Sequence, residues 1–96
     1  MSVLKKEKSS SIWIVYIIET KSGKLYTGIT TNLERRLKAH KTGKKGARFF
    51  NFSSPERVLF SQVHPNRSEA SKREAAIKKM NRQTKLDLCA NWVEKN

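Results

Sequence analysis

The chain has 96 residues, enough for one compact domain with a modest core. Its 21 lysines and arginines against 8 acidic residues give a formal net charge of +13, which makes a polyanion such as nucleic acid the expected partner. The single cysteine excludes an internal disulfide framework, and one cysteine with two histidines cannot make a structural zinc site of the usual spacing. No apolar run approaches the roughly 20 residues that cross a bilayer, so we expect a cytoplasmic protein without a membrane partner.

The first two predicted strands follow a short basic segment. Residues 1–11 are polar and lysine-rich, and we expect them to be flexible, ahead of a single domain over residues 12–94. Residues 12–18 (IWIVYII) are apolar without polar alternation, which predicts a central strand covered on both faces. After the turn sequence KSG, residues 24–29 (KLYTGI) predict a second strand that pairs with the first.

The length of the hairpin loop decides where two tyrosines point. A three-residue loop over residues 21–23 would set Tyr16 opposite Gly28 and place Tyr26 opposite Ile18. Both tyrosines would then share one face, and Gly28 would leave open space beside Tyr16. A two-residue loop would put the tyrosines on opposite faces.

A helix is predicted next, over residues 32–41. Residues 31–34 (TNLE) have the form of a capping box that begins at Thr31. Two leucines, at positions 33 and 37, would form its buried stripe, with Arg36 and His40 beside the stripe and Arg35 in solvent. Arg36 is therefore either a surface arginine whose stem covers apolar area or one that is aimed at a ligand.

The segment over residues 42–55 is predicted to be a basic and aromatic loop. Its cations are Lys44, Lys45 and Arg48, and its aromatic residues are Phe49, Phe50 and Phe52. We expect the cations to contact a nucleic-acid backbone. The phenylalanines could stack on unpaired bases, although packing under the loop is the favoured interpretation.

The remaining elements complete the predicted fold. Residues 57–63 predict a third strand, Ser68 can cap a helix that continues to residue 81, and Thr84 can begin a last helix that ends near Val93. Core positions are expected for Trp13, Met80, Cys89 and Trp92. The order β-β-α-β-α-α predicts an α/β (α+β) fold in which helices flank a small three-stranded antiparallel sheet.

One acidic residue stands out in the predicted helix that ends at residue 81. Glu74 is the only acid between Ala70 and Leu86, in a segment rich in cations: Lys72, Arg73, Lys78, Lys79, Arg82 and Lys85. On a helical wheel Glu74 lies at the margin of the apolar side. An ordinary ion pair with Lys78, four residues later, is the favoured explanation when this helix is considered alone.

Taken together, these residues resemble the GIY-YIG endonuclease superfamily, in its small stand-alone single-domain branch. The ordered set consists of the triplet Ile14-Val15-Tyr16, the triplet Tyr26-Thr27-Gly28 ten residues later, Arg36, His40, the loop at residues 44–48 (KKGAR) and Glu74 within residues 73–78 (REAAIK). The resemblance covers residues 13–88, nearly the whole domain. It departs from the family pattern at Ile14, which replaces a glycine and shares a face with Tyr16.

The resemblance implies hydrolysis of phosphodiester bonds, with DNA favoured over RNA. Its catalytic residues would be Tyr16, Tyr26, Arg36, His40 and Glu74, and its nucleic-acid contacts would include Lys44, Lys45, Arg48, Arg73 and Lys78. Glu74 would hold a single Mg²⁺ or Mn²⁺ ion. Arg36 would bind phosphate, and a tyrosine, by preference Tyr16, would position or deprotonate the attacking water.

Several alternatives stay open at this point. His40 could orient phosphate or transfer a proton, or it could be a half-buried histidine with local hydrogen bonds. The domain could be a nucleic-acid-binding module without catalysis, or an accessory protein that docks on an acidic partner. We expect a monomer without a small-molecule cofactor.

Overall fold

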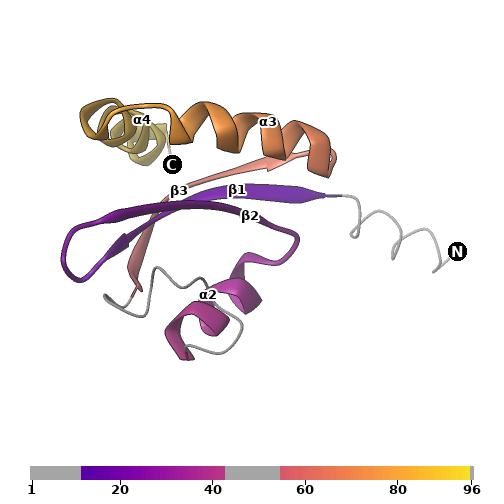
Figure 1. The fold of residues 1–96 in the computed structure, drawn as a ribbon, viewed down its shortest axis with the longest axis horizontal. Coiled ribbons are helices and arrows are strands. Elements are labelled where there is room, and N and C mark those ends of the chain that lie inside the picture. The colour runs from indigo at the N-terminus through magenta and orange to yellow at the C-terminus, as the bar shows by residue number, and fades with distance from the viewer. Residues whose placement is uncertain (1–11, 43–54, 96) are drawn as a thin grey trace, which may run out of the picture.

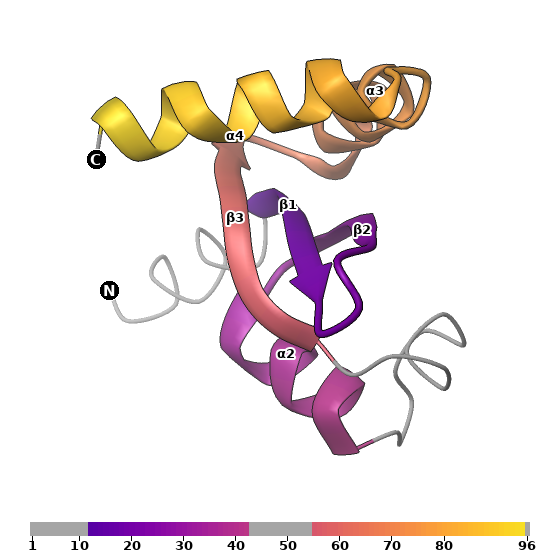
Figure 2. The same ribbon diagram turned by 90° about the vertical axis from the view of Figure 1, so that its left-hand side faces the viewer.

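The computed structural model describes residues 12–42 and 55–95, and the elements follow the predicted order. They are β1 (Trp13–Thr20), β2 (Leu25–Thr30), α2 (Leu33–Thr42), β3 (Pro55–His64), α3 (Arg67–Lys78) and α4 (Arg82–Lys95). The three strands form one antiparallel sheet in the order β2-β1-β3. Helix α2 covers one face of this sheet, and α3 and α4 lie over the other (Figures 1 and 2). The predicted α+β fold is confirmed.

Strand β1 lies at the centre of the sheet and is buried on both faces. Val15 and Ile17 belong to an apolar cluster on the α3–α4 side, which includes Ala70, Ile77 and Cys89. Two other side chains of β1 form a second cluster with the leucines of α2: Tyr16 and Ile18, packed by Leu33 and Leu37. Both faces of β1 exclude water, which explains why its sequence carries no polar alternation.

The remaining predicted core residues lie on the α3–α4 side. Cys89 is buried there, and Trp13, Met80 and Trp92 are half-buried against the same cluster. No helix in residues 12–42 or 55–95 is long and apolar enough to span a bilayer.

The β1–β2 hairpin has the predicted three-residue loop. Gly23 has a φ of 89°, the left-handed region that favours glycine, and its N–H donates to the Thr20 carbonyl oxygen at 2.9 Å. The register places Tyr16 opposite Gly28 and Ile18 opposite Tyr26. Alternation along the strands therefore puts both tyrosines on the face that α2 covers.

Three asparagines begin the three helices. In each case the side-chain oxygen accepts the N–H of the residue three positions on: Asn32 from Arg35 at 3.0 Å, Asn66 from Glu69 at 2.9 Å and Asn81 from Thr84 at 2.8 Å. The predicted starts at Thr31, Ser68 and Thr84 were wrong. A nearby hydroxyl residue gives a similar sequence signal, but the side chain that caps is the one at the turn where the backbone enters the helix.

Strand β3 is longer than predicted. It begins at Pro55, which the sequence placed in the preceding loop, and ends at His64. Proline is tolerated at the first position of an edge strand because no neighbouring strand needs its missing N–H. The predictions for residues 1–11 and for Lys44, Lys45, Arg48, Phe49, Phe50 and Phe52 lie outside the described residues.

Candidate active site

Three aromatic rings meet between the sheet and α2. The ring centroids of Tyr16 and Tyr26 are 6.2 Å apart, and the His40 ring lies 6.2 Å from the first and 5.5 Å from the second. The Tyr16 hydroxyl is 3.1 Å from His40 Nε2, a buried hydrogen bond between β1 and α2. The hairpin register supplies the tyrosines and the phase of α2 supplies the histidine, so the structure brings together three residues of the predicted site.

Gly28 is required by the close approach of the Tyr16 ring. A Cβ atom at position 28 would lie 2.6 Å from the Tyr16 hydroxyl oxygen and 3.1 Å from the Tyr26 ring. Contacts below 3 Å oblige something to move, and the Tyr16 hydroxyl is already held by His40. The predicted open space beside Tyr16 is therefore present, and the tyrosine ring extends into it.

Tyr16 is a neutral phenol under ordinary conditions. Its side chain is almost completely buried, at 1 % exposure. Burial and, after it, the proximity of Tyr26 raise its pKa to about 12, although the hydrogen bond and charge of Arg36 act in the opposite direction. The Tyr16 hydroxyl can therefore donate one hydrogen bond and accept others without carrying charge.

His40 is also uncharged, and it is more deeply buried than the half-buried position that the sequence suggested. It is 2 % exposed, and burial lowers its pKa to about 4, with the positive charge of Arg36 acting in the same direction. A neutral imidazole has one nitrogen that donates and one that accepts. The Tyr16–His40 pair can therefore exchange the roles of donor and acceptor.

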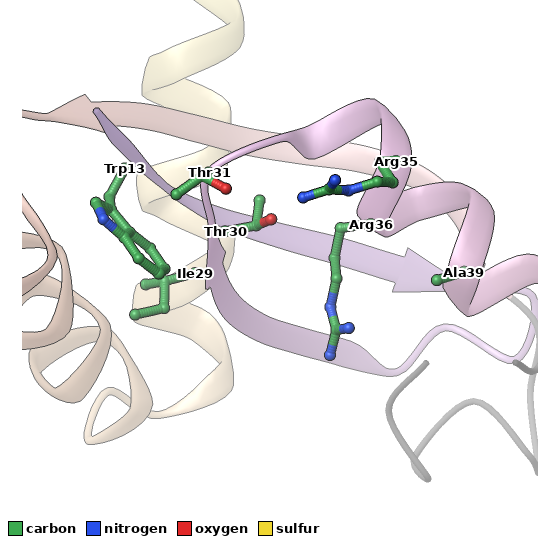
Figure 3. Close-up of a pocket in the computed structure, with 7 residues that line it drawn as sticks. All are labelled: Trp13, Ile29, Thr30, Thr31, Arg35, Arg36 and Ala39. Carbon is green, nitrogen blue, oxygen red and sulfur yellow. The ribbon is translucent and has the colours of Figure 1, made fainter. Parts of the chain in front are cut away.

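Arg36 is half-buried beside this pair. Its side chain is close enough to Tyr16 to hydrogen-bond it and to lower its pKa. Arg35 is exposed, as predicted, and its side chain runs in a different direction from that of Arg36 (Figure 3). The helical phase therefore distinguished the two arginines correctly.

Both arginines also line a hollow of about 350 Å³ that the sequence did not reveal. Its other lining residues come from three elements and one turn: Trp13, Ile29, Thr30, Thr31 and Ala39 (Figure 3). The sequence had placed Trp13 in the core and Arg35 in solvent. A hollow formed where the ends of separate elements meet leaves no periodic signal in any one of them.

Glu74 lies on α3, on the other side of the sheet from α2. Its side chain is 21 % exposed and its Oε2 accepts from Lys78 Nζ at 3.1 Å, so the ion pair that the helical spacing favoured is present. The carboxylate is nevertheless close enough to Tyr16 for its charge to raise the tyrosine pKa. Its neighbour Arg73 donates through Nε to Gln62 Oε1 on β3 at 3.1 Å.

The donor set is compatible with a hydrated ion bound by one carboxylate. Within the described ranges, no three His, Cys, Asp or Glu side chains come together in a group that could hold a metal. Mg²⁺ keeps several waters and is often bound by one or two carboxylates together with substrate phosphates. Glu74, half-buried and anionic, fits that kind of site, whereas a metal site enclosed by protein ligands does not fit.

Most of the chain matches a known protein family. The family model described as the GIY-YIG catalytic domain matches residues 12–87. A UPF0213 protein of Desulfotalea psychrophila is 41 % identical over 86 residues, which cover 90 % of this chain and 78 % of that protein. A UPF0213 protein of Photorhabdus laumondii is 44 % identical over 76 residues, covering 79 % of this chain and 72 % of its own length.

A solved structure shares the fold as well. The solution NMR structure of a UPF0213 protein from Bacillus halodurans is 37 % identical, with a TM-score of 0.53, and the match covers 82 % of this chain and 83 % of that one. The family match, the similar sequences and the shared fold all point to one family. The chain belongs to the GIY-YIG catalytic-domain family.

Proposed function

We propose that this protein is a metal-dependent endonuclease that hydrolyses phosphodiester bonds in DNA. The observation that carries the proposal is the buried hydrogen bond between Tyr16 and His40, 3.1 Å long, with Arg36 beside it. A structural hydrogen bond alone would not need a cation that opposes the protonation of one partner and favours the ionisation of the other. A site that binds a phosphate and moves a proton needs both the cation and the hydrogen-bonded pair.

Arg36 is the proposed phosphate ligand. Its guanidinium stays charged at any relevant pH and presents a planar fork of donors that matches two phosphate oxygens. Its backbone N–H donates to the Asn32 carbonyl oxygen at 3.1 Å, in the first turn of α2. The position of the arginine is therefore fixed by the start of the helix.

Tyr16 and His40 are the proposed proton carriers. At a pKa of about 12 a free phenolate would be scarce near pH 7, so Tyr16 needs an acceptor for its own proton while it takes one from water. His40 Nε2 is within hydrogen-bond distance of the Tyr16 oxygen. A substrate phosphate that neutralises Arg36 would remove one cause of the low His40 pKa and make the imidazole a better acceptor.

Tyr26 and Glu74 have supporting roles in this proposal. The Tyr26 hydroxyl would orient the attacking water or a phosphate oxygen from its place beside the other two rings. Glu74 would hold the Mg²⁺ or Mn²⁺ ion, in competition with Lys78 for the same carboxylate. When bound, the ion would neutralise phosphate charge and stabilise the leaving oxygen.

The isoleucine at position 14 is compatible with this site. Ile14 pairs with Thr30, two positions along from the pair of Tyr16 and Gly28, and its side chain is half-buried at the end of the same face. It does not separate Tyr16 from His40, because their polar atoms are in direct contact.

Cleavage assays test the proposal. Supercoiled plasmid, single-stranded and branched DNA are incubated with Mg²⁺ or Mn²⁺ and with wild type, Glu74→Ala or Arg36→Ala. Loss of a preorganised charged group in such sites costs about 10²–10³ in rate, so both variants should be almost inactive. Two matched controls should keep wild-type rates: Glu69→Ala on the same helix as Glu74, and Lys38→Ala on the same helix as Arg36, both exposed.

Two results would overturn the assignment. Equal cleavage by wild type and both site variants would show that the activity does not come from these residues. Binding of every DNA without cleavage of any would show a binding module instead of a nuclease.

A further inference from the structure

The hollow beside Arg36 has two unlike walls. It has a volume of about 350 Å³ and lies where β1 begins, β2 ends and α2 begins. Trp13 and Ile29 form an apolar wall, and Arg35 and Arg36 bring two cations from α2 (Figure 3). Between the walls stand only small side chains: Thr30, Thr31 and Ala39. A hollow that is aromatic on one side and cationic on the other fits a ligand that is flat and apolar at one end and anionic at the other.

The apolar wall is held in place by neighbouring residues. Trp13 is half-buried, packs against the core cluster on the α3–α4 side, and has the Arg67 guanidinium carbon 5.4 Å from its ring centroid. Ile29 comes from the adjacent strand, where it pairs with Val15, two positions along from Trp13. The indole is therefore supported by neighbours on two strands and by α3, and it can stack on a ligand with little loss of conformational freedom.

We propose that this hollow binds the nucleobase of an unpaired nucleotide adjacent to the phosphate held by Arg36. The inference rests on the proposed function, because it takes Arg36 as the phosphate ligand. Stacking on Trp13 and contact with Ile29 would hold the base, and Arg35 would contact the next phosphate along the strand. The volume is at the lower end of the roughly 300–1,000 Å³ typical of small-ligand sites, so one nucleotide fits and a base pair does not.

The hollow should bind different bases with similar affinity. Thr30 is the polar residue nearest the strand end, and its hydroxyl already accepts the Asn32 N–H at 3.1 Å and donates to the Asn32 carbonyl oxygen at 3.3 Å. Stacking on an aromatic face is open to every base. The site therefore selects for an unpaired base over a paired one, and only weakly for the identity of that base.

Fluorescence isolates the proposed contact. The sequence contains two tryptophans, so Trp92→Phe leaves Trp13 as the single reporter, and Trp13→Phe leaves Trp92 as the matched control. Binding is measured without divalent metal, so that no cleavage is required, using a mixed-sequence single-stranded oligodeoxynucleotide and an abasic phosphodiester chain of the same length. We expect the oligonucleotide to quench Trp13 and not Trp92, and the abasic chain to quench neither.

Affinity gives a second readout. Stacking on an aromatic ring is worth about 5- to 150-fold per base, so wild type should bind the oligonucleotide at least fivefold more tightly than the abasic chain. Trp13→Ala should remove most of that preference and Trp13→Phe should retain it, which separates loss of stacking from loss of folding. A fully paired duplex of the same sequence should bind without quenching Trp13.

The outcomes separate this inference from the proposed function. Binding of the oligonucleotide with unchanged Trp13 fluorescence, or equal affinity of wild type for the abasic chain, would overturn the base site even if the protein cleaves DNA. Base-dependent quenching in a protein that cleaves nothing would uphold the site and overturn only the nuclease assignment.

Discussion

The buried Tyr16–His40 hydrogen bond joins two groups that titrate far from their usual ranges. Because the His40 pKa falls from 6.5 to about 4 on folding, the unfolded chain binds a proton between these values that the folded chain does not. The free energy of unfolding should therefore decrease as the pH falls from 6.5 towards 4, by at most about 1.4 kcal/mol per pH unit for this one proton. Well above pH 6.5 neither state binds this proton, so this loss of unfolding free energy is absent.

Urea unfolding at several pH values between 7 and 4 checks the prediction. Wild type should lose more stability across this window than His40→Gln, which cannot take up the proton, while the carboxylates contribute equally to both proteins. Parallel pH profiles for the two proteins would contradict the low pKa of His40.

The close contact between Gly28 and the Tyr16 ring predicts the effect of adding one methyl group at position 28. Gly28→Ala places a methyl group 2.6 Å from the Tyr16 hydroxyl oxygen, so the ring must move and the bond to His40 must lengthen or break. We expect about 1–3 kcal/mol of destabilisation, as for other overpacked sites. If the proposed function holds, cleavage should fall more than this loss of folded protein explains.

A double variant tests that cause. Tyr16→Leu removes both atoms that the new methyl group meets, the hydroxyl oxygen at 2.6 Å and Cζ at 2.8 Å. The two changes should therefore not add: the unfolding free energy of Gly28→Ala with Tyr16→Leu should exceed the additive value. Strict additivity, measured by chemical denaturation, would place the strain elsewhere.

At the scale of elements, the start of α2 controls where Arg36 and His40 stand. Asn32 accepts the Arg35 N–H, and replacement of such a cap by alanine costs about 0.5–2 kcal/mol. Asn32→Ala should therefore lower stability and also cleavage, because the helix that carries both side chains frays at its first turn. Asn81→Ala removes the equivalent cap of α4 at a similar cost and should leave the cleavage rate of the folded protein unchanged. Equal loss of cleavage in both variants would contradict a local effect.

The hairpin and the caps show what local sequence can predict. Alternation and a loop glycine reduced the pairing to two possibilities, because both rules act within a few residues, and the structure has the three-residue loop that pairs Tyr16 with Gly28. The predicted cap positions were wrong by one to three residues, because the choice between neighbouring asparagine and hydroxyl side chains depends on where the backbone turns. That turn is set by how each helix packs on the sheet.

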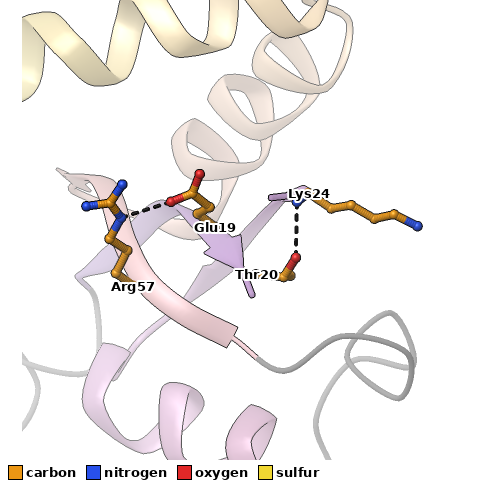
Figure 4. A network of polar contacts seen from close by, with 4 residues as sticks. All are labelled: Glu19, Thr20, Lys24 and Arg57. Atoms are coloured by element: carbon orange, nitrogen blue, oxygen red, sulfur yellow. Dashed lines mark hydrogen bonds and ion pairs between the residues drawn. The ribbon is translucent and has the colours of Figure 1, made fainter. Parts of the chain in front are cut away.

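Strand β3 was predicted too short for a related reason. Its first residues pair with the end of β1, where Glu19 lies opposite Arg57 and Thr20 opposite Pro55. Arg57 Nε donates to Glu19 Oε1 at 2.9 Å, close to the hairpin where the Lys24 N–H donates to Thr20 Oγ1 at 3.1 Å (Figure 4). A partner strand distant in sequence therefore extended β3 beyond what its own composition indicates.

At the scale of the whole molecule, the charge of +13 makes salt the main variable in any binding measurement. Each phosphate contact on a single strand contributes about −0.7 to the slope of log affinity against log salt concentration. For the proposed contacts Lys44, Lys45 and Arg48, each replacement by alanine should make the slope shallower by about that amount. Lys72→Ala is the control, because Lys72 Nζ lies 3.6 Å from Glu69 Oε2. An unchanged slope in the three loop variants would remove them from the contact surface.

The two faces of the sheet also differ in how much apolar surface they bury. Among residues 12–42 and 55–95, the cluster under α3 and α4 contains more fully buried side chains than the cluster under α2, where Tyr16 and Ile18 meet half-buried Leu33 and Leu37. Helix α2 can therefore detach locally while the rest stays folded. Its backbone amides should exchange with deuterium faster than those of α3, as NMR would measure. A ligand on Arg36 should slow that exchange, because binding to the docked helix opposes its release.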